Sequence, residues 1–246
     1  MENQHSALGY SAVSTFENCP YQYKLRFIDN VEMLDEYEAT DALKIGTALH
    51  RGIETDVPTA IQEYYNSYPI ISDLHINEAI KLEIVLKKAR EILPLSNAIF
   101  EYELNTEHFK GFIDMLVPIS DNEYDMYDFK YSNNIDKYMQ SPQLSIYKYY
   151  FEKLNPGKYI RNMYFVFVPK TMIRQKKTED LYQFRKRLIE TLETLSPKVV
   201  SVNYNFYKVV DFIENQVNIL TCNDYVKNET NLCDWCEYQA YCNNKE

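Results

Sequence analysis

The first third of the chain carries apolar residues three or four positions apart, and the middle carries short apolar runs separated by polar turns. The helical spacing predicts four helices, over 11–28, 41–54, 59–66 and 75–93. The short runs are rich in β-branched and aromatic residues and predict three strands, over 99–105, 109–117 and 124–131. The chain therefore changes from helix to sheet near Pro94.

The second half alternates between the two kinds of element. Its pattern predicts a helix over 141–153, a buried strand over 160–168, and amphipathic helices over 179–195 and 206–220. This order is typical of one α/β domain with a helical N-terminal elaboration. We expect a single domain over 1–246, with a mainly helical part in 1–95, the sheet core in 96–170, and C-terminal helices and a cysteine cluster in 171–246.

Length and composition fit a globular protein, because 246 residues can bury a sizeable core. No apolar run approaches the roughly 18 residues that a membrane span needs, and the first residues lack a basic-then-apolar signal. We therefore expect a soluble, cytoplasmic protein with no membrane partner. Thiols stay reduced in that compartment, so clustered cysteines predict a metal or cluster site rather than disulfides.

Three of the five cysteines close the chain with the spacing C-x2-C-x5-C, at Cys233, Cys236 and Cys242. Three thiolates need a fourth ligand to hold a metal ion or an iron–sulfur cluster. Cys19 is the candidate, and it would join the first helix to the last; Cys222 is interpreted as an ordinary thiol. A zinc site in an unrelated scaffold is the alternative, which the remote position of Cys19 disfavours.

Two carboxylates and a lysine fall on neighbouring predicted strands. Asp128 and Lys130 are two apart and point to the same side, and Asp114 lies on the preceding strand. Carboxylate oxygens suit a hard divalent cation, and a lysine beside it can orient water or stabilise phosphate charge. His50 could complete the metal shell and would favour manganese. Each of these sequence features is common by itself. A D-x-K triplet usually lies on a solvent-exposed face of a strand, and a single histidine in an apolar helix usually has a structural role.

The formal net charge of −10 argues against broad phosphate binding. Basic residues nevertheless concentrate after the strand over 160–168, at Lys170, Arg174, Lys176 and Lys177. They form a candidate DNA-binding stretch, and 23 tyrosines offer rings for base stacking. The alternative is a solvated basic segment.

Four motifs together resemble the PD-(D/E)XK nuclease superfamily, and in particular its RecB-type branch. In chain order they are G-T-x-x-H at 46–50, G-F-I-D at 111–114, D-F-K at 128–130 and Q-L-x-x-Y at 143–147. The opening S-x-x-x-x-F-x-x-C-P-Y-x-Y and the cysteine ending are similar to members that carry a 4Fe–4S cluster. Those members include the CRISPR-associated four-cysteine exonucleases and the AddB nuclease domain.

The resemblance implies a restriction-endonuclease-like core, a mixed central sheet flanked by helices, with an iron–sulfur clasp joining the termini. It implies a Mn²⁺ or Mg²⁺ ion held by His50, Asp114, Asp128 and the backbone carbonyl of Phe129, with Lys130 as the catalytic lysine.

The resemblance also gives roles to residues outside these strands. Gln143 and Tyr147 would position the substrate. The cluster ligands would be Cys19, Cys233, Cys236 and Cys242. Relatives often add a glutamate on the first strand, where Glu101 and Glu103 share a face, so that choice stays open. Tyr131-Ser132 departs from the Thr-Ser or Thr-Gly pair that commonly follows the lysine.

These features favour a metal-dependent exonuclease on single-stranded or end-frayed DNA, in DNA repair, recombination or CRISPR-type processing. The negative net charge of the chain favours binding of a single-stranded DNA end over tight binding of duplex DNA. The alternative is a non-catalytic or conditionally active adaptor that holds DNA ends for a recombination or integration partner, because a shared fold does not guarantee activity. Cleavage polarity, endonuclease activity and oligomeric state stay open.

Overall fold

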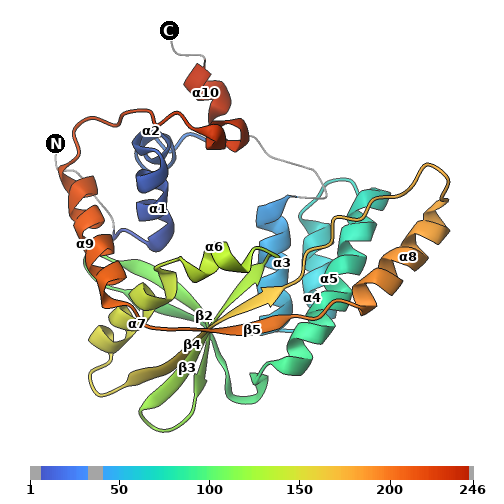
Figure 1. The fold of residues 1–246 in the computed structure, drawn as a ribbon, viewed down its shortest axis with the longest axis horizontal. Helices are drawn as coiled ribbons and strands as arrows, with labels where there is room; N and C mark the ends of the chain where they lie inside the picture. The colour runs from blue at the N-terminus through green and yellow to red at the C-terminus, as the bar shows by residue number, and fades with distance from the viewer. Residues whose placement is uncertain (1–6, 33–40, 244–246) are drawn as a thin grey trace.

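The computed structural model describes residues 7–32 and 41–243, and its centre is one five-stranded sheet in the order β1-β2-β3-β4-β5 (Figure 1). The strands are β1 (Ile99–Asn105), β2 (Lys110–Pro118), β3 (Glu123–Tyr131), β4 (Tyr159–Val168) and β5 (Lys198–Val202). The β3–β4 pair is parallel and the other pairs are antiparallel. A mixed sheet flanked by helices confirms the expected α/β class.

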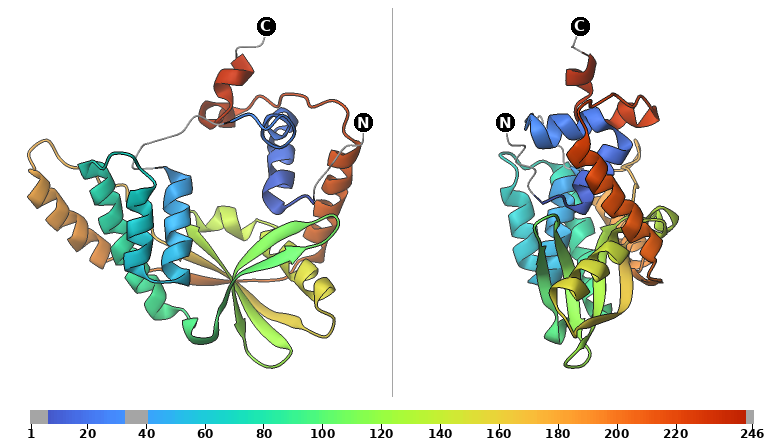
Figure 2. Two further views of the ribbon diagram at one scale, coloured as in Figure 1. Left: turned by 180° about the vertical axis from the view of Figure 1, so that it is seen from behind. Right: turned by 90° about the vertical axis from the view of Figure 1, so that its left-hand side faces the viewer.

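One face of the sheet packs against four helices. They are α3 (Ala42–Glu54), α4 (Val57–Asn66), α5 (Asp73–Ile92) and α8 (Leu181–Glu193). A short 3-10 turn, η2 (Leu95–Asn97), leads from α5 into β1. Figure 2 shows these helices gathered at one end of the molecule. Phe129, Val166 and Val168 supply the sheet side of this core.

The other core lies between the sheet and the remaining helices. α7 (Gln143–Leu154), α9 (Phe206–Thr221) and α1 (Tyr10–Asn18) enclose it, and α6 (Ile135–Met139) lies beside it. The sheet contributes Met126, Phe165 and Phe167, which alternate with the residues of the first core as a strand of period two requires. The sheet is thus covered on both faces.

The N-terminal helix α2 (Pro20–Tyr23) and the C-terminal segment that ends in α10 (Gln239–Asn243) lie side by side (Figure 1). α1 is followed by α2 and a π-helical turn, η1 (Lys24–Ile28), and the C-terminal segment forms η3 (Asn231–Trp235) and α10. Gln22 Nε2 donates to the Glu237 carboxylate at 3.1 Å, and the Tyr238 hydroxyl donates to the Val31 carbonyl at 3.4 Å. These bonds join segments more than two hundred positions apart.

The structure differs from the predicted elements in three places. The helix predicted over 11–28 is interrupted at Cys19, whose φ of −159° is extended, because the residue before a proline is disfavoured in helix. The short helix α6 was not predicted. The edge strand β5 was not predicted either, because five residues at the end of a sheet leave little periodic signal, and it extends the sheet beyond 96–170. Among the described residues, no helix is long and apolar enough to cross a membrane.

Candidate active site

The predicted carboxylates meet where β2 and β3 separate. The hydrogen-bonded ladder between these strands ends at the Met115–Tyr127 pair. Beyond it, Asp114 Oδ2 accepts the backbone N–H of Phe129 at 2.7 Å. The Asp114 side chain therefore takes the place of a ladder bond, which fixes its carboxylate beside the next residues of β3.

Asp128 and Lys130 face this opening from β3. Lys130 Nζ lies 2.6 Å from Asp128 Oδ2 and donates to Gln143 Oε1 at 3.0 Å. Asp128 is 1 % exposed, and within the described part of the chain neither of its carboxylate oxygens accepts a hydrogen bond of normal geometry. A buried carboxylate whose oxygens lack donors is unusual, and it suits coordination to a cation.

His50 reaches the same opening from α3. Its Nε2 lies 3.7 Å from Asp114 Oδ2, and its Nδ1 lies 3.7 Å from Glu101 Oε1. One ligand atom from each of His50, Glu101 and Asp114 can be chosen so that all lie within 4.8 Å of one another. Gly52 lets α3 pack closely on α5, because a Cβ there would lie 2.5 Å from Leu86 Cδ1.

The structure distinguishes the two glutamates that the sequence left open. Glu101 has a φ of +49°, the left-handed region that a non-glycine residue rarely adopts. The β1–β2 pairing passes from Phe100–Met115 to Tyr102–Ile113 and skips the position opposite Asp114. Such backbone strain concentrates at functional sites. Glu103 instead forms an ion pair with Lys110 at 3.1 Å, so Glu101 is the glutamate that the fold brings to His50.

Burial and mutual charge shift the protonation of these groups. Burial and the neighbouring Asp128 charge raise the pKa of Asp114 to about 7. Burial by itself disfavours the His50 imidazolium, but the carboxylates of Glu101, Asp114 and Asp128 outweigh it and raise the pKa of His50 to about 9. The same balance, with Asp128 as the main partner, raises the pKa of Lys130. The carboxylates of the site thus outnumber its two cationic side chains, His50 and Lys130, and each raised pKa reflects this excess of negative charge.

The α7 helix carries the two remaining predicted residues. Gln143 and Tyr147 are one turn apart, and Gln143 Nε2 donates to the Tyr147 hydroxyl at 3.3 Å. Burial and then the Asp128 charge raise the pKa of Tyr147, so its hydroxyl stays protonated near neutral pH. Gln143 therefore links the lysine to the helix, and the structure brings together all six side chains that the motifs singled out.

The donor set fits a hard divalent cation. Two carboxylates and one imidazole, from Glu101, Asp114 and His50, offer ligand atoms within 4.8 Å of one another, and the Asp128 charge is close enough to raise the pKa of Asp114. Carboxylate oxygen is the donor that Mg²⁺ and Mn²⁺ favour. The Phe129 N–H is used by Asp114, and a ligand role for the Phe129 carbonyl stays a prediction.

The four predicted cluster cysteines line one cavity of about 800 Å³ between the two ends of the chain: Cys19, Cys233, Cys236 and Cys242. The Cys19 thiol accepts the N–H of Asn228 at 3.4 Å. Among the described residues these sulfurs are not as close together as the His50 group, so they do not form a compact single-ion site. Cys222 lies apart from this cavity, where its thiol donates to the Asp224 carbonyl.

The predicted basic stretch lies in the segment between β4 and α8. Lys170 packs beside the end of β3, with its ammonium 6.0 Å from the centre of the Tyr131 ring and its backbone N–H donating to Asn133. Arg174, Lys176 and Lys177 are exposed farther along the same segment. Of these four residues, only Lys170 thus contacts β3.

Comparison with known proteins gives one family. A family model described as the PD-(D/E)XK nuclease superfamily matches residues 7–243. No curated protein matches the chain.

Two solved structures are similar to the chain at low sequence identity. One, titled a "Putative exonuclease" from Eubacterium rectale, is 11% identical, with 94% of this chain and 92% of that chain covered and a TM-score of 0.51. The other, titled the crystal structure of SSO0001, is 14% identical, with 100% and 90% covered and a TM-score of 0.39. At these identities the first likeness shows the fold alone.

Proposed function

The chain belongs to the PD-(D/E)XK nuclease superfamily, and from that membership we propose that it is a metal-dependent deoxyribonuclease, an exonuclease on single-stranded or end-frayed DNA. The observation that carries this proposal is the buried carboxylate of Asp128. Lys130 Nζ lies 2.6 Å from it, yet among the described residues neither of its oxygens accepts a hydrogen bond of normal geometry. Buried polar groups in native proteins are normally hydrogen-bonded, so this carboxylate needs an explanation, and a bound cation supplies one. A role in DNA repair, recombination or CRISPR-type processing rests on the sequence resemblance.

In this proposal His50, Glu101, Asp114 and Asp128 hold Mn²⁺ or Mg²⁺. When bound, such an ion would stabilise charge on the phosphate and lower the pKa of a water. Lys130, held by Gln143 Oε1, donates a hydrogen bond to that water or to the developing negative charge. Gln143 keeps the lysine aimed at the opening between β2 and β3, and Tyr147 fixes the Gln143 amide.

We also propose that the cysteines ligate a 4Fe–4S cluster that ties the chain ends together. Support comes from the four thiols that line one cavity between α2 and η3. An iron–sulfur cluster separates its thiolate ligands more widely than a single zinc ion does, since inorganic iron and sulfide lie between them. An anaerobic preparation should be brown with iron and sulfide bound; a colourless preparation with stoichiometric zinc would favour the zinc alternative.

The nuclease proposal is tested on end-labelled single-stranded DNA with Mn²⁺ or Mg²⁺. Lys130→Met should lose cleavage by roughly 100-fold or more, because it removes an electrostatic stabiliser of the transition state. Lys148→Met is the matched control, since both lysine side chains are 17 % exposed and each lies 2.6 Å from a carboxylate. Lys148 pairs with Glu152 away from the site, so its variant should cleave normally when folded.

The outcomes separate the two function classes. Equal cleavage by wild type and Lys130→Met would show that the catalytic assignment is wrong. Tight binding of DNA ends with no cleavage in either metal would instead favour the adaptor, and that protein should co-purify with a partner.

A further inference from the structure

A groove of about 960 Å³ begins at the catalytic helix α7 and runs between β2 and the N-terminal helices. Gln143 and Tyr147 line its inner end, and Gln143 is the residue that accepts a hydrogen bond from Lys130. The groove is therefore continuous with the proposed active site, within one side chain of the catalytic lysine.

The walls of this groove are aromatic. Phe27 of η1 and Phe112 of β2 line it and are 37 % and 41 % exposed, unusually open for phenylalanine side chains. Tyr10, Tyr23 and Tyr225 line it as well. Phe112 lies two residues before Asp114 on the same strand, so one wall leads directly to the metal-binding carboxylates.

The electrostatic character of the groove is distinct from that of the whole chain. The net charge is −10, yet none of the described residues that line the groove is Asp or Glu. Lys110 lines it, with its ammonium 5.7 Å from the centre of the Phe112 ring. Arg26, which does not line the groove and pairs with Glu237 at 3.6 Å, lies with its guanidinium 5.4 Å from the centre of the Phe27 ring. Each exposed ring is thus accompanied by a cation, which suits a polyanion that carries flat rings.

The groove wall is fixed in place before any ligand binds. A Cβ on Gly9 would lie 2.6 Å from the Lys110 carbonyl oxygen, so glycine is what allows the start of α1 to approach β2. The Leu8 N–H donates to the His108 carbonyl at 3.0 Å, and the Tyr10 hydroxyl bonds Ser141 at 3.0 Å. A preformed site loses less conformational entropy on binding.

We propose that this groove binds the unpaired DNA strand that leads to the active site, with bases stacked on Phe27 and Phe112 and a phosphate on Lys110. This inference rests on the proposed nuclease function. Base stacking on aromatic rings is tolerant of sequence, and phosphate binding supplies the rest of the affinity. Lys110 can exchange its half-exposed Glu103 partner for a phosphate at little cost, because such surface ion pairs are weak.

The test measures binding apart from cleavage. Fluorescence anisotropy of an oligothymidylate of about 15 nucleotides is titrated with the full chain in EDTA. Phe112→Ala and Phe27→Ala should each weaken binding by roughly 5- to 100-fold, the fold-change expected from the loss of one stacked base. Phe112→Tyr should retain the affinity, whereas Phe112→Leu, which keeps an apolar side chain, should not.

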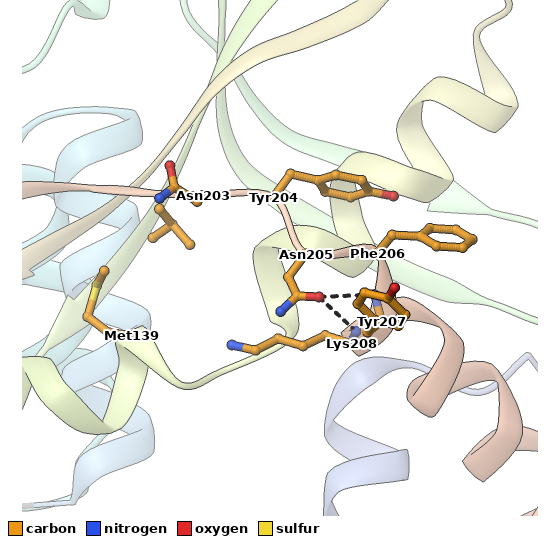
Figure 3. Close-up of a pocket in the computed structure, with 8 residues that line it drawn as sticks. Met139, Asn203, Tyr204, Asn205, Phe206, Tyr207 and Lys208 are labelled. Atoms are coloured by element: carbon orange, nitrogen blue, oxygen red, sulfur yellow. Dashed lines mark hydrogen bonds between the residues drawn. The ribbon is translucent and has the colours of Figure 1, made fainter.

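The matched control is an exposed aromatic residue in a separate pocket of about 520 Å³ at the start of α9 (Figure 3). Tyr207 is 80 % exposed there beside Lys208, and this pocket shares no lining residue with the groove. Tyr207→Ala should bind the oligonucleotide as wild type does. Lys110→Gln should lower the slope of log affinity against log salt by about 0.7, the value for one phosphate contact on a single strand.

Two results would overturn the groove assignment. One is unchanged affinity in folded Phe27→Ala and Phe112→Ala proteins; the other is wild-type protein that binds duplex but not the oligothymidylate. Either result is compatible with Mn²⁺-dependent cleavage by wild type and its loss in Lys130→Met. Failure of the groove assignment can therefore be told apart from failure of the nuclease proposal. Folding of each variant is checked by its urea unfolding midpoint.

Discussion

Replacement of Asp114 by asparagine should make the metal-free protein more stable while it abolishes cleavage. Burial and the Asp128 charge raise the pKa of Asp114 from 3.8 to about 7, so the folded protein binds a proton that the unfolded chain has released. Stability therefore falls as pH rises from about 4 to about 7, and the full penalty is present at pH 8. Asparagine carries no charge and has no such penalty.

The size of the effect follows from the pKa shift and its neighbours. About three pKa units correspond to at most about 4 kcal/mol at pH 8. Asparagine keeps an oxygen for the Phe129 N–H and removes the charge that the neighbouring Asp128 charge repels. His50 loses one of its negative neighbours, which offsets part of the gain. We expect a net gain of about 1–2 kcal/mol in the free energy of unfolding.

Urea unfolding in EDTA from pH 5 to pH 9 measures this gain, and cleavage is assayed in Mn²⁺. Wild type should gain about 2.7 kcal/mol when Mn²⁺ is present at a hundred times its dissociation constant, and Asp114→Asn should gain much less. The opposite stability result, an Asp114→Asn protein that is less stable than wild type in EDTA at pH 8, would refute the reasoning.

The matched control is Asp125→Asn, a buried carboxylate on the neighbouring strand β3. Asp125 accepts hydrogen bonds from Arg161 at 3.2 Å and from Asn162 at 3.0 Å, so its charge is compensated. The same substitution should there cost about 1 kcal/mol, the typical worth of one hydrogen bond, and leave cleavage unchanged.

Three further substitutions test neighbouring parts of the argument. Glu101→Gln should weaken Mn²⁺ binding by roughly tenfold in a thermal-shift titration, whereas Glu103→Gln should not, because only Glu101 approaches His50; equal effects would contradict the choice of glutamate. Gly46→Ala should raise the free energy of unfolding by about 1 kcal/mol, because its Cβ would meet nothing within 4 Å and alanine favours helix; a lower urea midpoint would contradict this. Cys236→Ala should lose brown colour and lower the midpoint, whereas Cys222→Ala should keep its colour, and a brown, fully stable Cys236→Ala protein would exclude the clasp.

The local pattern of the chain determined most of its elements. Period-two alternation in 124–131 placed Asp128 and Lys130 on one side of a strand, and the side chains lie 2.6 Å apart. Helical spacing in 41–54 placed His50 on a helix that faces the sheet. These are consequences of backbone geometry, which repeats every few residues and is therefore visible in sequence. The edge strand β5 was too short to leave such a signal, whereas the break at Cys19 is marked in the sequence by Pro20, which helical spacing alone does not register.

Tertiary structure alone decided which groups meet. Glu101 and Glu103 are equivalent by alternation, and only the positive φ at Glu101 together with the skipped pairing opposite Asp114 separates them. The groove that joins Phe27 to Phe112 likewise depends on how α1 packs against β2, an approach that Gly9 permits. Contacts between distant segments are set by packing and strand register, which no local period encodes. The sequence thus identified the chemical groups, and the fold selected their partners and the path that leads to them.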